Sequence, residues 1–254
     1  MAEQLHETVL ADIGRRIVGG EYPEGAVLLA EHLGHQFSVS RSVIREVVRA
    51  LESLGLVKSV KRLGIRVLPR PQWNVFDPLI IRWRLALPGE RGAQLWSLTE
   101  LRSAIEPPAA ALSALNMPTQ DASTLLILAG QMREIGRSGD LETFLEFDIR
   151  FHTAILEGSA NEMFAKLGVA VGEVLSGRTR EGLMPDHPQE EALQQHIEIA
   201  RAINVRDPAA ARMAAQKVID RTSYEVAKNP ASRPRWATGH RRVHRDTEPE
   251  SRDR

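Results

Sequence analysis

The sequence has no cysteine, so the chain can form no disulfide and perform no thiol chemistry, which fits a cytoplasmic protein. It also lacks any run of 18 apolar residues, and this absence argues against a membrane-spanning helix and a membrane partner. The first 16 residues are amphipathic and charged, and they contain no apolar core of a secretory signal. Hydrophobic residues nevertheless make up 43% of the 254 residues, enough for two domains with packed cores.

The chain has no net charge either, because 33 Lys and Arg residues balance 33 Asp and Glu residues. The two signs are separated along the first 70 residues. Residues 1–35 contain two Arg and six acidic residues, a net charge of −4, whereas residues 36–70 contain eight basic and two acidic residues, a net charge of +6. A local basic patch is typical of phosphate binding, although a solvated basic face has the same composition.

Three helices followed by two short strands are expected in residues 1–70. Apolar residues recur at helical spacing from Leu5 to Val18, a short helix is expected near 29–37, and a longer helix capped by Ser38 or Ser40 runs to about Leu54. Two β-prone runs then flank a short basic tip, and they cover residues 56–60 and 65–68. This order of elements is that of a winged helix-turn-helix.

Beyond residue 70 the sequence predicts a linker and then helices only. Residues 71–91 are the linker, with a short helix near 77–87 that Pro88-Gly89 ends. Residues 92–228 are expected to form an all-helical domain, and residues 229–254, which have few aliphatic side chains, a disordered tail. The helices of the larger domain are expected near 93–115, 119–138, 140–158, 161–180, 188–204 and 207–228. The predicted fold is therefore mainly α, a winged helix-turn-helix followed by an all-α bundle.

The predicted third helix has the layout of a DNA recognition helix. Arg41, Arg45 and Arg49 follow one another at four-residue spacing, opposite an apolar face. Arginine makes bidentate contacts to guanine or phosphate, and the amides near Ser42, at the helix start, can donate to phosphate. An ordinary surface helix with Arg–Glu pairs is the alternative, but the helix comes with a basic wing.

The wing is the tip between the two predicted strands. Lys61 and Arg62 are placed to lie along the minor groove, and Gly64 lets the backbone turn tightly and approach the duplex closely. The predicted DNA contacts are Arg41, Ser42, Arg45, Arg49, Lys61, Arg62 and Gly64.

This part of the chain resembles the GntR family of transcriptional regulators. The resemblance rests on residues 17–25, 39–46 and 51–57 and on the wing. It implies a regulator of operator DNA, and because one winged helix reads too few bases, we expect a two-fold homodimer. The chain departs from the family at Leu28-Leu29, where Leu-Pro is usual, and its second helix is one residue short. The family's phosphate contact from that helix is therefore not included among the predicted DNA contacts.

A second set of residues has the spacing of a metal site. Asp148 and His152 lie four residues apart and project from one helix face, and His196 on a later helix can supply a third ligand. A mixed carboxylate–imidazole set suits Zn, Ni or Mn rather than Ca. A structural Asp–His pair is the more common use of this spacing. Arg102 on the first helix of the domain is a natural carboxylate clamp, although most such arginines are solvated.

These motifs resemble the FCD sensor domain of the FadR branch of the same family. The matching segments are residues 100–107, 147–152, 195–196 and 207–211. The resemblance implies a divalent metal, held by one Asp and three His, that helps to bind a carboxylate effector. Asp148, His152 and His196 match three of these ligands, whereas the fourth position falls at Val218, which cannot ligate. Water or an effector oxygen would then complete a zinc shell.

A finer resemblance indicates the class of effector. Residues 70–78 and Arg82-Trp83 are similar to the regulators of galactonate and other sugar-acid catabolism in this family. It implies a repressor that a sugar acid such as an aldonate releases from DNA, with the carboxylate at Arg102 and the metal. Asn161, and less directly Arg178, are candidates for the other polar contacts. A different organic acid as effector, or activation in place of repression, stays open. A metal-dependent enzyme that acts on a sugar acid is a further alternative, but the sequence places no evident general base beside the triad.

Overall fold

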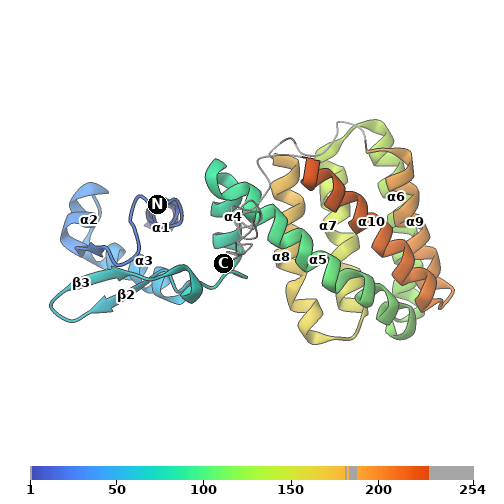
Figure 1. The fold of residues 1–254 in the computed structure, drawn as a ribbon, viewed down its shortest axis with the longest axis horizontal. Coiled ribbons are helices and arrows are strands. Elements are labelled where there is room, and N and C mark those ends of the chain that lie inside the picture. The colour runs from blue at the N-terminus through green and yellow to red at the C-terminus, as the bar shows by residue number, and fades with distance from the viewer. Residues whose placement is uncertain (1, 181, 183–187, 229–254) are drawn as a thin grey trace, which may run out of the picture.

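The structure is a computed structural model that describes residues 2–180, 182 and 188–228. It has a small N-terminal unit with a three-stranded sheet and a larger bundle of helices, with one short helix between them (Figure 1). The mainly α fold predicted from the sequence is confirmed. The tail predicted at 229–254 lies outside the described residues.

The N-terminal unit consists of three helices and three antiparallel strands in the order β1-β3-β2. The strand Val27–Leu28 was not predicted, because two residues are too few to show an alternating pattern, and it pairs with β3 along one edge. The elements are α1 (Ala2–Val18), β1 (Val27–Leu28), α2 (Ala30–Gln36), α3 (Arg41–Ser53), β2 (Val57–Val60) and β3 (Gly64–Val67).

Helix α3 begins where the sequence provides a cap. Ser40 precedes the first turn, and its hydroxyl accepts a hydrogen bond from the Val43 amide at 3.4 Å. On the apolar side of the helix, which packs on α1, Ile44, Val47 and Leu51 are each at most 1% exposed. Burial of this side leaves the opposite side of α3 in solvent.

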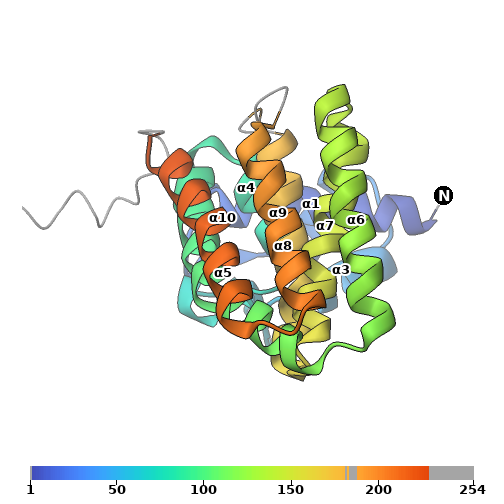
Figure 2. The ribbon, with the colours of Figure 1, turned by 90° about the vertical axis from the view of Figure 1, so that its right-hand side faces the viewer.

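The larger unit is a bundle of six helices (Figure 2). Helix α10 packs along α5 and α9, and α7 packs against α5, α6 and α8. The last five helices begin and end within two residues of their predicted bounds. The helices are α5 (Pro88–Asn116), α6 (Thr119–Ser138), α7 (Leu141–Gly158), α8 (Glu162–Arg180), α9 (Glu190–Asn204) and α10 (Pro208–Lys228).

The start of α5 differs from the prediction. Pro88-Gly89 was expected to separate two helices, but Pro88 is the first residue of α5. The prediction was wrong because proline has no amide hydrogen to lose at a helix start and its φ angle already suits the first turn. Helix α4 therefore meets α5 at Leu87, with no intervening loop.

Helix α4 (Pro78–Ala86) lies between the two units and touches both (Figure 1). Asp77 caps it by accepting a hydrogen bond from the Leu79 amide at 2.9 Å. Trp83 packs against Gly14 of α1, and Leu85 packs against Gly177 of α8. A short 3-10 turn, η1 (Arg70–Gln72), precedes α4. Within the described ranges, none of the helices has the length and hydropathy that crossing a bilayer requires.

Candidate functional site

Three arginines form an exposed row on α3. The side chains of Arg41, Arg45 and Arg49 are 90%, 67% and 63% exposed. Arg41 lies 3.6 Å from Glu31 and Arg45 lies 3.6 Å from Glu46, while Arg49 donates a hydrogen bond to Glu46 at 3.0 Å. Exposed pairs of this kind contribute little energy, so these guanidinium groups can exchange their partners for phosphate or base edges at small cost.

The start of α3 also presents polar groups to solvent. The hydroxyl groups of Ser40 and Ser42 lie 2.8 Å apart, and both residues are exposed. The basic tip between β2 and β3 follows the same pattern, because Lys61 and Arg62 are exposed. Arg62 itself takes the left-handed turn conformation, with φ of 64°.

Gly64 has a different neighbour from the one expected. Its φ is 119°, and a Cβ atom there would lie 2.8 Å from the carbonyl oxygen of Leu28. Gly64 therefore permits a close approach to β1 inside the domain, and its positive φ angle is part of the geometry of the sheet. The sequence predicts a close approach at Gly64 but does not reveal strand β1 next to it.

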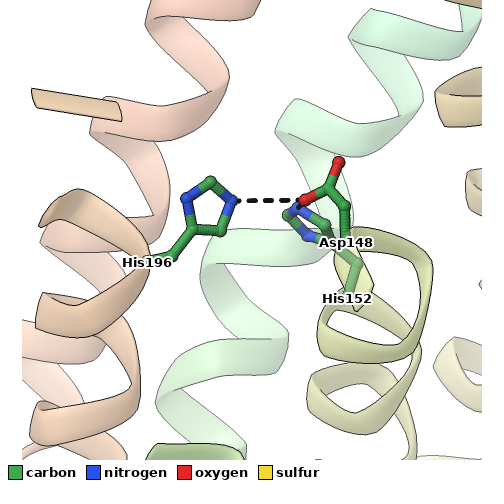
Figure 3. Close-up of side chains that lie close together, drawn as sticks. All are labelled: Asp148, His152 and His196. Atoms are coloured by element: carbon green, nitrogen blue, oxygen red, sulfur yellow. Dashed lines mark ion pairs between the residues drawn. The ribbon is translucent and has the colours of Figure 1, made fainter. Parts of the chain in front are cut away.

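Asp148, His152 and His196 meet in the interior of the bundle (Figure 3). Asp148 and His152 come from α7 and His196 from α9, and all three residues are buried. The Nε2 atoms of His152 and His196 lie 3.3 and 3.4 Å from the Asp148 Oδ1 atom. One potential ligand atom from each residue thus lies within 4.8 Å of the other two.

Neighbouring groups fix the orientation of both imidazoles. His152 Nδ1 lies 2.9 Å from the Glu106 Oε2 atom, and His196 Nδ1 lies 2.8 Å from the Ala192 carbonyl oxygen. Because a carbonyl oxygen only accepts, His196 must carry its proton on Nδ1, and Glu106 favours the same tautomer of His152. In both rings the Nε2 atom then faces Asp148, and once it carries no proton it can ligate a metal.

The three residues fit a divalent ion. Asp148 Oδ1 and His196 Nε2 are buried and face each other at 3.4 Å, but neither atom makes a well-formed hydrogen bond among the described residues. In a tetrahedral zinc site with bonds of about 2.0–2.1 Å, neighbouring ligand atoms lie about 3.3 Å apart, close to the separations seen here. An ion bound between them would satisfy atoms that the protein leaves unpaired.

Arg102 and Glu106 form a buried ion pair next to the triad. Arg102 is 1% exposed, and its Nε atom donates to Glu106 Oε1 at 2.5 Å. Burial by itself would raise the pKa of Glu106, but Arg102 and His152 outweigh it and lower that pKa to about 2. The Nη1 atom of Arg102 has no partner among the described residues. It is the group that an entering carboxylate can pair with.

The charges around the triad favour its ionised carboxylate. Burial opposes charge on Asp148, yet the adjacent His152 and His196 lower its pKa below the ordinary value. Burial likewise opposes charge on His152, but Glu106 and Asp148 raise the pKa of His152 to about 9. His152 thus lies between two carboxylates, Glu106 and Asp148, a setting that also attracts a divalent cation.

A cavity of about 60 Å³ opens beside the triad between α5, α7, α8, α9 and α10. Arg102 and the triad line one part of it, and Arg178 of α8 lines another. Val218 faces it from α10, at the position where the family's fourth ligand is expected. Other polar residues around the cavity are Gln189, Gln195, Arg221, Thr222 and Glu225.

Asn161 does not lie in this group. Its side-chain oxygen accepts from the amide of Met163 at 3.0 Å, which caps the start of α8. It is absent from the cavity lining, so the structure gives it no route to an effector there. The turn at Gly158–Ala160 that made Asn161 a candidate is the reason it caps the helix.

Two carboxylates of this region were missed by the reasoning from sequence. Glu106 lies four residues after Arg102, a helical spacing that indicates an ion pair and was available in the sequence. Glu225 of α10 accepts a hydrogen bond from Arg178 at 2.8 Å, although 47 residues separate them. No local pattern indicates that contact.

Comparison with known proteins identifies both parts of the chain. Residues 5–67 match the bacterial regulatory proteins of the gntR family, and residues 97–221 match the FCD domain. The galactonate operon transcriptional repressor of Escherichia coli (strain K12) is 32% identical over an alignment of 218 residues, with coverage of 84% of this chain and 93% of that protein. The chain belongs to the GntR family. This GntR protein is a DNA-binding transcriptional regulator with an FCD domain, and it is not an enzyme.

Two further relatives of this GntR protein extend the comparison. The Exu regulon transcriptional regulator of Escherichia coli (strain K12) is 27% identical over 232 residues, covering 86% of this chain and 83% of that protein. The solved structure of Lar, which controls the expression of the Listeria monocytogenes agr system, has a TM-score of 0.55 at 16% identity. It covers 88% of this chain and 96% of that one, and at this identity the likeness shows the fold alone.

Proposed function

We propose that this GntR-family protein is a cytoplasmic repressor of a sugar-acid catabolic operon and that a sugar acid releases it from its operator. Similarity to the galactonate repressor along most of both chains, and to the Exu regulator, supports the class of pathway. The observation that carries the proposal is a group of buried polar atoms beside one cavity that make no hydrogen bond within the described part of the chain: Arg102 Nη1, Asp148 Oδ1 and His196 Nε2. Such atoms are costly unless a ligand satisfies them.

In the proposed site Asp148, His152 and His196 hold the metal, and Arg102 binds the carboxylate of the effector. The two separations between Asp148 Oδ1 and the imidazole nitrogens fit zinc with four ligands, and Ni or Mn are the other candidates. Because Val218 supplies no ligand, water or the effector occupies the remaining position. The bound ion supplies positive charge for the carboxylate, while Glu106 keeps Arg102 and His152 oriented.

The exposed row on α3 is proposed to enter the major groove. Arg41, Arg45 and Arg49 contact base edges and phosphates, and Ser42 at the start of the helix contacts phosphate. Lys61 and Arg62 of the wing lie along the adjacent minor groove. We propose a homodimer on a pseudo-palindromic operator, because one such unit reads too few bases for useful specificity.

The experiment that tests this function measures fluorescence anisotropy of DNA from upstream of the protein's own gene. The purified full chain should bind this DNA more tightly than a shuffled duplex, with a strong decrease of affinity at higher salt. Addition of galactonate together with zinc should release the DNA. Equal affinity for the upstream and shuffled duplexes at low salt would overturn the role as a repressor.

The effector class is tested separately by thermal denaturation. A ligand of the folded state raises the melting temperature by mass action, so sugar acids and other carboxylates are compared with and without zinc. We expect stabilisation by sugar acids that depends on the ion. Stabilisation by a different organic acid, without any by sugar acids, would overturn the effector class and leave the DNA-binding function standing.

A further inference from the structure

Arg178 is a second buried cation that lines the same cavity, and a carboxylate of the protein forms an ion pair with it. Arg178 is 5% exposed, and its Nη2 atom donates to Glu225 Oε2 at 2.8 Å. Its Nη1 atom is 3.5 Å from the Thr222 hydroxyl, and its Nε atom has no partner among the described residues. Glu225 is thus the principal partner of a guanidinium group that the bundle encloses.

Glu225 is more exposed to solvent than the other carboxylates near the cavity, so its side chain can move away from Arg178. Its side chain is 36% exposed, whereas those of Glu106 and Asp148 are 5% and 7% exposed. It also lies 3.5 Å from Arg221, which has a second acidic neighbour in Glu191. Glu225 can therefore rotate toward solvent without leaving Arg221 unpaired, while Arg178 would lose its ion pair.

The size of the cavity requires some group to move before a sugar acid enters. Its volume of about 60 Å³ is far below the roughly 300 Å³ of small-ligand pockets. Glu225 lines this cavity and is the half-exposed carboxylate on its α10 side. Its displacement would open the space next to Arg178.

We propose that Glu225 occupies the subsite of an anionic group of the effector, so that the preferred effector carries two anionic groups, one at Arg102 and one at Arg178. This inference rests on the proposed sugar-acid function and specifies the class of acid. A buried arginine without a counter-ion is strongly unfavourable, and a neutral hydroxyl end of a ligand would not replace the carboxylate that it displaces. A second carboxylate would, through a charge-assisted hydrogen bond.

Galactonate and galactarate provide a matched pair of probes, because they differ only at C6, where the first has a hydroxymethyl group and the second a carboxylate. Isothermal titration calorimetry of the full chain with zinc should show that galactarate binds about tenfold more tightly. Arg178→Gln should abolish that preference. Glu225→Gln should increase the affinity for galactarate, because it removes the competing charge and keeps an oxygen acceptor for Arg178.

The control is Glu198→Gln, which removes a carboxylate of α9 that lies 4.0 Å from Lys217. Its side chain is 46% exposed and does not line the cavity, so the affinities of both acids should stay unchanged. Tighter binding of galactonate than of galactarate, with no effect of Glu225→Gln, would overturn the second subsite and leave the sugar-acid function intact. If neither galactonate nor galactarate binds, the second subsite and the sugar-acid function are both overturned. If Arg178→Gln does not fold, Glu225→Gln alone decides the outcome.

Discussion

Gly177 of α8 lies against Leu85 of α4 so closely that a Cβ atom on Gly177 would fall 2.6 Å from Leu85 Cδ1. The next residue, Arg178, lines the cavity, and Trp83 on the same helix α4 covers Gly14 of α1. A bidentate ion pair between Arg82 and Glu173 also joins α4 to α8. Helix α4 therefore connects the wall of the cavity to the DNA-binding unit through direct contacts.

Gly177→Ala tests whether this contact transmits the effector signal. The added methyl group should push α4 away from α8 and reduce the effector-induced loss of operator affinity by about fivefold or more, within the usual range of coupling. The change is measured as operator affinity with and without effector. Gly172→Ala on the same helix is the control, since its Cβ would meet only Ile149 at 3.4 Å. Equal responses of both variants and wild type would exclude this route.

Glu106→Gln tests the carboxylate that orients His152. We expect zinc affinity to fall by about 10–100-fold, because the neutral amide no longer fixes the tautomer or balances the charge of the site. Competition with a fluorescent chelator measures the affinity. Glu100→Gln, an exposed position of the same helix that binds the Trp96 indole, should leave it unchanged. Wild-type zinc affinity in Glu106→Gln would show that Glu106 serves packing alone.

The features that the sequence predicted correctly depend on helical periodicity. The i, i+4 spacing of Asp148 and His152 places both side chains on one face of α7, whatever surrounds the helix. The same periodicity buries Ile44 and Val47 and leaves Arg45 in solvent. Helix bounds followed from caps such as Ser40 for the same reason, since capping is local.

The features that escaped prediction depend on contacts between distant segments. Glu225 reaches Arg178 only because α10 packs across the bundle, and the sequence near Glu225 gives no sign of it. The strand Val27–Leu28 exists because β3 offers an edge. The sequence predicts a close approach at Gly64 but does not show that Leu28 is its neighbour. A local pattern thus determines the face of a helix but not the partner opposite that face.

Zinc removal should destabilise the FCD domain. The three potential ligands come from α7 and α9, so an ion that binds them in the folded chain joins two helices. At a zinc concentration about 100 times its Kd, mass action gives about 2.7 kcal/mol of added stability. Thermal denaturation after chelation, and again after zinc is restored, measures this. In Asp148→Asn and His196→Ala the zinc-dependent increase should vanish, and its persistence would place the ion elsewhere.

Arg45→Ala tests the recognition helix. Removing this exposed guanidinium should weaken operator binding by about 1–3 kcal/mol if it reads a base, or reduce the salt slope by about one if it contacts phosphate. Fluorescence anisotropy at several salt concentrations distinguishes the two. Arg201→Ala, an exposed arginine of α9 in the other unit, is the control and should bind like wild type. Wild-type operator binding by Arg45→Ala would mean that α3 is not the recognition helix.

Gly14→Ala tests the other end of the connection through α4. A Cβ atom at Gly14 would lie 2.3 Å from the Trp83 ring, so the indole must move, and such overpacking costs about 1–3 kcal/mol. Chemical denaturation measures the loss of unfolding free energy. Gly130→Ala provides the matched control, because it is also helical and a Cβ there meets nothing within 4 Å. That control should gain up to about 1 kcal/mol from helix propensity. A gain in both variants would show that Trp83 moves freely, and α4 would then be too loosely held against α1 to transmit a shift of the cavity wall.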